Sequence, residues 1–227
     1  QTINRVERYK LSGNTVTDRK VIIDNIPGSS FHDGGRIAFG PDANLYVTTG
    51  DAGNPDSAQD LNSLAGKILR RNDDGSIPAN NPLNSAVYSY GHRNPQGLAW
   101  SENGALYATE HGRSGNDEVN VIRPGRNYGW PIIQGDQWKQ GMENPRIHSG
   151  ATTTWAPASI VYYQGRIFFT GLRGEALYEY DPYVLREHLK KEYGRLRVVK
   201  LGPDGFFYIA TSNTDGRGNI NPGDDKI

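Results

Sequence analysis

The chain has 227 residues, a length that suits one sizeable domain. Its 25 lysine and arginine residues balance 25 aspartate and glutamate residues, which argues against a nucleic-acid surface or a polybasic membrane-binding face. Cysteine is absent from the sequence, so disulfides and thiolate metal sites are excluded. No apolar run approaches the roughly 20 residues that a membrane-spanning helix needs.

The first predicted element is a strand, because the opening stretch "INRVERYKL" alternates in hydropathy. Short runs rich in Val, Ile, Tyr and Phe then follow, bounded by Gly, Asn, Asp and Pro, and this pattern predicts an all-β chain with tight turns. The chain starts at Gln1 without an apolar leader segment. We interpret this as an internal or processed start, with any targeting segment outside the sequence.

A repeated hairpin pattern organises the chain. Each copy has an apolar residue, a polar turn, and an alternating strand centred on Tyr46, Tyr107 or Tyr208. The copies are residues 39–51, 100–112 and 201–213, with a degenerate copy at 162–174. Their spacing of roughly 40 to 60 residues is typical of four-stranded propeller blades. The sequence therefore predicts a β-propeller domain over residues 1–227, in preference to a β-sandwich with similar hairpins.

One helix is predicted, over residues 183–194, "YVLREHLKKEYG". Val184, Leu185 and Leu189 would share one face, and Gly194 would end the helix.

Polar and charged residues flank the repeated hairpins. In a propeller, equivalent positions of successive blades meet at one end of the central channel, so these residues would converge on one pocket. They are His32, Asp51, Arg93, Asn94, Glu110, His111, Arg195, Arg197 and Asn213. Such a set predicts a site for an anionic ligand with a base beside it.

Each of these residues also has a structural interpretation. A lone histidine such as His32 is usually structural or solvated, although Asp51 could orient its imidazole as a base. Arg93 and Asn94 could be a capping pair. Arg195 and Arg197 could be solvated charges on outer strands. Against that, they alternate in "GRLRVV" and so share one strand face without a nearby acidic partner, which favours an oxyanion ligand.

Two further segments carry weaker signals. The turn residues of "TEHGRSGNDEVNVI", residues 109–122, could supply oxygen ligands to a hard cation, although the EF-hand spacing is missing. In "RNYGWP", residues 126–131, Trp130 is predicted to be a core residue.

These motifs together resemble the soluble quinone-dependent enzymes of the glucose/sorbosone dehydrogenase family, and the aldose sugar dehydrogenase branch in particular. The segments that carry the resemblance follow in the family's order and are "HDGGRIAFGPDANLYVTTGD", "AGKILRRNDDGSIPANNP", "GHRNPQGLAW", "EHGRSGNDEVNVI", "NYGWP", "WAP" and "GRLRVV". The resemblance covers nearly the whole chain. It implies a six-bladed propeller, of which this chain supplies about four blades, with the N-terminal blades missing.

The resemblance also implies a role for individual residues. His32 would be the general base, oriented by Asp51, and Arg93 would lie near the reactive carbonyl of pyrroloquinoline quinone (PQQ). The other residues implied to contact the quinone are Asn94, Thr154, Arg173, Arg195 and Arg197. The carbonyl groups of Gly112 and Arg113 would bind the calcium ion that holds the quinone, and Glu118 and Tyr128 would hold a second calcium ion.

The implied activity is oxidation of the anomeric carbon of aldoses to the lactone, with electrons passed to an external acceptor in the periplasm or outside the cell. The segment "HSGATTTWAP" lacks the extra aromatic and polar groups of the glucose-specific branch, so a broad range of aldoses is expected. Two alternatives stay open: a calcium-dependent propeller lactonase, and a propeller that binds a ligand without catalysis.

Overall fold

The computed structural model describes residues 2–227, which form strands joined by turns and one short 3-10 helix, η1, at Pro55–Ala58. The chain divides into two compact units. The first unit comprises Gln1–Pro95, Arg123–Ile133 and Trp138–Glu143, and the second comprises Gln96–Ile122, Gln134–Gln137 and Asn144–Ile227. Each unit is described by itself below. No helix in the described part of the chain is long and apolar enough to span a membrane.

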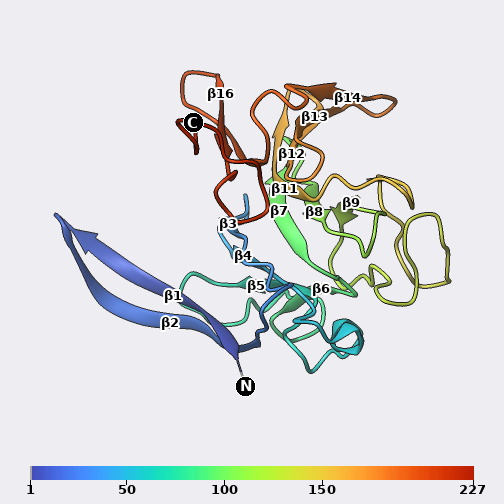
Figure 1. The fold of residues 1–227 in the computed structure, drawn as a ribbon. Coiled ribbons are helices and arrows are strands. Elements are labelled where there is room, and N and C mark those ends of the chain that lie inside the picture. The colour runs from blue at the N-terminus through green and yellow to red at the C-terminus, as the bar shows by residue number, and fades with distance from the viewer. Residues whose placement is uncertain (1) are drawn as a thin grey trace. The chain divides into compact units, whose positions relative to one another are not determined.

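The first unit contains a hairpin and a four-stranded antiparallel sheet (Figure 1). The hairpin pairs β1 (Ile3–Ser12) with β2 (Thr15–Pro27), and the sheet has the order β3 (Ile37–Phe39), β4 (Leu45–Thr49), β5 (Lys67–Arg71) and β6 (Val87–Tyr90). Ile22, Ile23 and Ile26 of β2 pack in one core cluster with Leu45 and Val47 of β4. The base of the hairpin therefore shares a core with the sheet.

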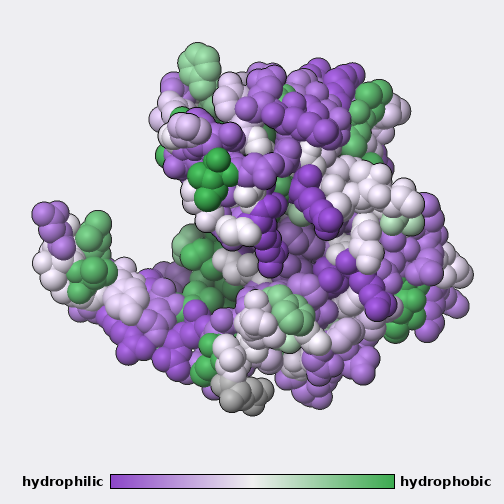
Figure 2. All heavy atoms as spheres, viewed as in Figure 1, coloured by the Kyte–Doolittle hydropathy of each residue, from purple (hydrophilic) through white to green (hydrophobic). Residues whose placement is uncertain are grey.

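The far end of the β1–β2 hairpin lies outside that core. Leu11 and Val16 are 73% and 62% exposed, and apolar atoms show on the surface of the hairpin in Figure 2. Backbone pairing holds the two strands together at that end, and midway along the hairpin Glu7 of β1 bonds to Arg19 of β2. Exposed ion pairs of this kind contribute little to stability, because solvent and salt screen them.

The second unit contains three antiparallel sheets. The first has the order β10 (Ile147–His148), β9 (Glu118–Ile122), β8 (Leu106–Glu110) and β7 (Pro95–Trp100), where β7 begins at the last residue of the first unit. The others are β11 (Pro157–Tyr163), β12 (Arg166–Gly171), β13 (Ala176–Tyr180) and β14 (Leu185–His188), and the pair β15 (Leu196–Leu201) with β16 (Phe207–Thr211). Trp155, Phe169 and Tyr178 pack together in an aromatic cluster of its core.

All four predicted hairpins are confirmed. They are β3–β4, β7–β8, β11–β12 and β15–β16, each antiparallel. Their turns contain residues with positive φ, among them Ala43 (61°), Gly104 (82°), Gly165 (78°) and Gly205 (82°). A short turn between antiparallel strands needs this backbone region, which explains the glycine at this position in three of the four turns.

The predicted helix over residues 183–194 is wrong. Leu185–His188 form the edge strand β14, paired with β13, and Leu189 and Lys191 have positive φ angles of 55° and 61°. The apolar periodicity has no core to face, because Val184 is 44% exposed and Leu185 is 36% exposed. Side chains of β14 instead bond to β13: His188 Nε2 lies 2.7 Å from Glu179 Oε2. A helix gains most of its stability from burying one face, and here no such face is available.

Candidate active site

His32 lies in the turn before β3 with a positive φ of 60°. Its Nδ1 is 2.8 Å from Asp51 Oδ1, just after β4 of the same hairpin. The backbone of the turn comes so close to Gly50 that a Cβ there would meet the His32 carbonyl oxygen at 1.8 Å. The glycine before Asp51 therefore lets the histidine turn dock against the end of β4, and this contact brings imidazole and carboxylate together.

Asp51 is almost fully buried, with its side chain 1% exposed, whereas that of His32 is 20% exposed. Burial alone would raise the pKa of Asp51, but hydrogen bonds from His32 and the Gly53 N–H outweigh burial and lower the pKa below its usual value. The carboxylate therefore stays ionised and only accepts hydrogen bonds. The Nδ1 of His32 then carries the proton, which leaves Nε2 with a lone pair that can act as a base.

Arg93 and Asn94 follow β6 and lie in the same unit as His32 and Asp51. The Arg93 carbonyl accepts the Asp51 N–H at 2.8 Å, and Asn94 Oδ1 accepts the Gly34 N–H at 3.1 Å. Both residues thus fix the backbone around the His32–Asp51 pair. The Arg93 guanidinium carbon lies 5.4 Å from the centre of the Trp130 ring, a distance typical of a cation–π contact.

The loop between Asp51 and β5 is held by Lys67, which sequence reasoning did not single out. Its side chain is fully buried, and its Nζ donates to the carbonyl oxygens of Ser57, Ala58 and Ala65 at 2.8, 3.1 and 2.6 Å. Burial lowers the pKa of Lys67 to about 8, so the group is still mostly protonated at neutral pH. All three N–H bonds of the ammonium group therefore tie this loop to the start of β5.

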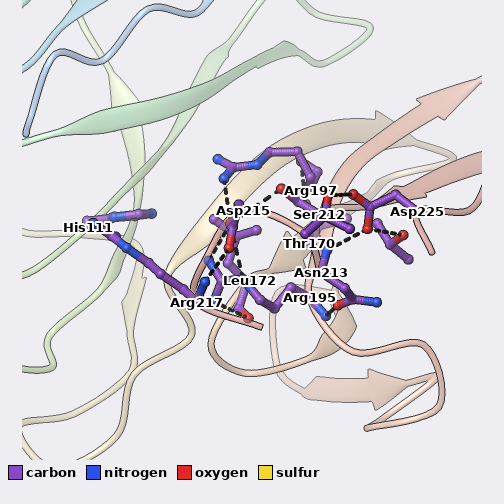
Figure 3. A network of polar contacts seen from close by, with 12 residues as sticks. His111, Thr170, Leu172, Arg195, Arg197, Ser212, Asn213, Asp215, Arg217 and Asp225 are labelled. Carbon is purple, nitrogen blue, oxygen red and sulfur yellow. Dashed lines mark hydrogen bonds and ion pairs between the residues drawn. The ribbon is translucent and has the colours of Figure 1, made fainter. Parts of the chain in front are cut away.

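In the second unit, Arg195 and Arg197 converge on one carboxylate, that of Asp215 (Figure 3). Arg195 donates to Asp215 Oδ2 from Nε at 3.2 Å and from Nη2 at 2.8 Å, and Arg197 donates from Nη2 at 3.3 Å. The expectation that these arginines lack an acidic partner is wrong. Asp215 follows β16, and the pairing of β15 with β16 brings the two segments together. The shared carboxylate fixes both guanidinium groups.

Thr154 and the turn at Gly112 and Arg113 are organised by a second unpredicted residue, the buried Asp117. Its Oδ2 accepts the Thr154 hydroxyl at 2.6 Å and the N–H groups of Trp155 and Ala156, while its Oδ1 accepts the Gly112 N–H at 2.8 Å. No hydrogen bond to the carbonyl oxygens of Gly112 and Arg113 is found within residues 2–227. The turn therefore has free carbonyl groups in a fixed geometry, which suits a hard cation.

Arg173 is exposed in the turn after β12, where its N–H donates to the Trp155 carbonyl at 3.1 Å. Its guanidinium group has no hydrogen bond or ion pair with any residue that the structure describes. It is therefore an available cation in the same unit as Thr154, Arg195 and Arg197.

Glu118 and Tyr128, predicted to share one metal ion, fall in different units, so their pairing stays a prediction. Glu118 lies beside Glu110, and burial first and this neighbour second raise its pKa to about 8. Tyr128 is buried, its hydroxyl accepts the Arg123 N–H at 2.8 Å, and its ring stacks on His92. Within residues 2–227 no group of three or more His, Asp or Glu side chains could hold a metal ion.

The predicted site residues thus form two groups. The first unit brings together His32, Asp51, Arg93 and Asn94, and adds Trp130, which sequence reasoning assigned to the core. The second unit contains Gly112, Arg113, Thr154, Arg173, Arg195 and Arg197, and adds Asp117 and Asp215. The group in the first unit provides a histidine that can act as a base. The group in the second unit provides several cations and free carbonyl groups.

The chain is similar in sequence and in structure to known proteins. Residues 1–220 match the family described as Glucose / Sorbosone dehydrogenase. The PQQ-bound aldose sugar dehydrogenase of Streptomyces coelicolor has a similar structure, with a TM-score of 0.90 and 42% identity over 97% of this chain and 70% of that one.

Two curated relatives have similar sequences. The aldose sugar dehydrogenase YliI of Escherichia coli (strain K12) is 32% identical over 88% of this chain and 63% of its own length. The quinoprotein glucose dehydrogenase B of Acinetobacter calcoaceticus is 40% identical over 60% of this chain and 33% of its own length. The chain thus spans less than two thirds of the length of these relatives.

Proposed function

The chain belongs to the glucose/sorbosone dehydrogenase family, and we propose that it is the larger part of an enzyme that oxidises the anomeric carbon of aldose sugars to the lactone by hydride transfer to PQQ. The observation that carries this proposal is the contact of 2.8 Å between His32 and the buried Asp51. It provides an oriented imidazole whose Nε2 is a base, as oxidation of a hydroxyl-bearing carbon requires.

The role of His32 is to take the proton of the anomeric hydroxyl group on Nε2. Asp51 keeps the proton on Nδ1 and stabilises the imidazolium that forms, because its carboxylate is ionised and held by further donors. Arg93 is the cation in this unit that would face the negative charge developing on the oxidant. The base and the cation are therefore linked through Asp51, whose carboxylate bonds to His32 and whose N–H donates to the Arg93 carbonyl.

The side chains of the second unit fit a ligand with several carboxylates. Arg173, Arg195 and Arg197 supply three guanidinium groups, of which two share the single carboxylate of Asp215. Their planar forks match carboxylate geometry. Together with Thr154, and with Arg93 and Asn94 of the first unit, they are the residues that would hold PQQ. When bound, this cofactor supplies an electrophilic quinone carbonyl that accepts a hydride.

We assign the calcium ion that accompanies the quinone to the carbonyl groups of Gly112 and Arg113. The support is their freedom from hydrogen bonds within residues 2–227, in a turn that Asp117 holds from one side. A second calcium ion is assigned to Glu118 and Tyr128. The raised pKa of Glu118 supports a cation there, because an enclosed carboxylate beside Glu110 lacks a compensating charge.

The proposal extends to the whole protein. We propose a six-bladed propeller, of which this chain forms about four blades, each built on one of the four hairpins. We further propose a periplasmic or extracellular location, a broad range of aldose substrates, and an external electron acceptor that reoxidises the cofactor.

Reconstitution tests the proposal. PQQ and calcium are added to the apo-protein, the visible absorbance of the quinone is recorded, and dye reduction is measured with a panel of aldoses. We expect a shifted quinone spectrum and dye reduction that requires sugar, quinone and calcium together. Full quinone binding without dye reduction by any aldose would refute the proposed activity. Lactone hydrolysis without quinone would instead identify a lactonase.

A further inference from the structure

Trp130 connects the groups proposed to carry the chemistry of the first unit. Its indole Nε1 donates to Asp51 Oδ2 at 2.9 Å, although the two residues are 79 positions apart in sequence. The residue is 8% exposed, and the Arg93 guanidinium carbon lies 5.4 Å from the ring centre. One side chain therefore contacts both the carboxylate behind the base and the cation beside it.

The indole donor has a defined function in orienting the carboxylate. Asp51 Oδ1 accepts from His32 and from the Gly53 N–H at 2.9 Å. On Oδ2, Trp130 is the donor that the structure records within residues 2–227. A carboxylate held at both oxygens cannot rotate about its Cβ–Cγ bond without losing charge-assisted hydrogen bonds, which are about twice as strong as neutral ones.

Trp130 is itself firmly anchored. Its N–H donates to the Gly91 carbonyl at 2.9 Å, and its carbonyl accepts Gln59 Nε2 at 2.6 Å. Gln59 and Asn127 bond to each other through both amide groups, at 2.7 and 3.1 Å. The indole is therefore placed by the backbone of the segment after β6, from which Arg93 also comes.

We propose that Trp130 is a positioning residue that holds the Asp51 carboxylate and the Arg93 guanidinium in a fixed relation, so that base and cation act on the same substrate. The inference rests on the proposed function for its catalytic consequence. The arrangement of the His32–Asp51 pair by Trp130, however, can be measured in the protein without cofactor or sugar.

Removing the indole N–H has a predictable electrostatic effect. The charged groups recorded around the Asp51 carboxylate are His32 and, across the indole ring, Arg93. Without the donor on Oδ2, more of the negative charge of Asp51 is available to an imidazolium at His32. The pH dependence that rests on the His32–Asp51 pair is therefore expected to move to higher pH when the indole N–H is lost.

The test uses Trp130→Phe, which keeps an aromatic ring beside Arg93 and removes the N–H. The matched control is Trp138→Phe, the same substitution at a site 73% exposed in the same unit. The His32 ring is titrated by NMR in the apo-protein, with its signal assigned from His32→Ala. The pH profile of kcat/KM with PQQ, calcium and an aldose is measured in parallel.

We expect Trp130→Phe to raise the His32 midpoint, to move the acidic limb of kcat/KM in the same direction, and to lower kcat about tenfold. Trp138→Phe should match the unsubstituted protein in all three. An unchanged midpoint in folded Trp130→Phe would overturn the inference, whether kcat falls or not, since a mere core residue would alter stability alone. A raised midpoint in a protein that oxidises no aldose would support the positioning role and refute the proposed function.

Discussion

At the scale of single residues, His32 is the group on which the proposed reaction depends. Replacing His32 by Ala should lower the rate of dye reduction by about two to four orders of magnitude, the usual contribution of a general base. Quinone affinity should change little, because the arginines and Thr154 would hold the cofactor. The variant is assayed with saturating quinone and calcium. His188→Ala, which removes a partly exposed histidine of β14, is the control and should keep full activity. Near-full activity of His32→Ala would show that another group is the base.

Lys67 is a buried residue whose loss should destabilise the first unit. Lys67→Met removes three donors: the Ala58 carbonyl keeps the Gly91 N–H, whereas the carbonyl groups of half-buried Ser57 and buried Ala65 lose the donor recorded for them. The expected loss is about 3 kcal/mol in the free energy of unfolding, since each unsatisfied buried acceptor costs about 1–3 kcal/mol and water can reach some of them.

Urea unfolding of Lys67→Met measures this loss. Lys10→Met on the exposed strand β1 is the control and should change stability by less than about 0.5 kcal/mol. If both variants unfold at the same urea concentration, the ammonium group does not hold the loop after Asp51.

At the scale of elements, Asp117 joins the turn before β9 to the segment before β11. The Asp117 carboxylate accepts four hydrogen bonds. In Asp117→Asn one of its two oxygens becomes an NH2 group, which can only donate and therefore faces other donors. We expect the Gly112 turn and the Thr154 segment to separate, with calcium affinity reduced at least tenfold and unfolding easier by about 2–4 kcal/mol.

Calcium binding to Asp117→Asn is followed by calorimetry and its stability by urea unfolding. Asp136→Asn is the matched control, because the Asp136 side chain is 95% exposed and bonds only to His148 within the described residues. If Asp117→Asn binds calcium as tightly as the control does, Asp117 has no role in the proposed metal site.

At the scale of the whole molecule, β3 is the edge of its sheet in the described chain and carries two exposed apolar residues. Ile37 is 56% exposed and Phe39 is 59% exposed. An apolar edge strand with unpaired backbone groups pairs readily with other chains. We therefore expect this polypeptide alone to self-associate as its concentration rises.

Static light scattering over a concentration series measures that association. Phe39→Glu should reduce it, since a charge on an edge strand opposes pairing. Tyr183→Glu replaces a 92% exposed aromatic residue in the turn before β14 and should leave the self-association unchanged. If the polypeptide stays monomeric at every concentration, the β3 edge does not mediate self-association.

The four hairpins were predictable because their signals are local. A polar turn between alternating strands needs residues that accept positive φ, and these residues stand within a few positions of each other. The pairing of His32 with Asp51 followed from the same hairpin, whose two ends the register brings together. The prediction of a helix at residues 183–194 was wrong for the converse reason. The local sequence has helical periodicity, but no core lies beside this segment against which an apolar helix face could be buried.

The sequence by itself therefore determined the all-β hairpin architecture, the histidine paired with a carboxylate, and the arginines suited to an anionic ligand. Only the tertiary structure decided what holds them: Trp130 on Asp51, Asp215 between Arg195 and Arg197, and Asp117 beneath Thr154. These contacts join residues that lie 18 to 79 positions apart. No local pattern specifies them, because a buried hydrogen bond forms where packing places a donor against an acceptor, and packing depends on how separate strands come together.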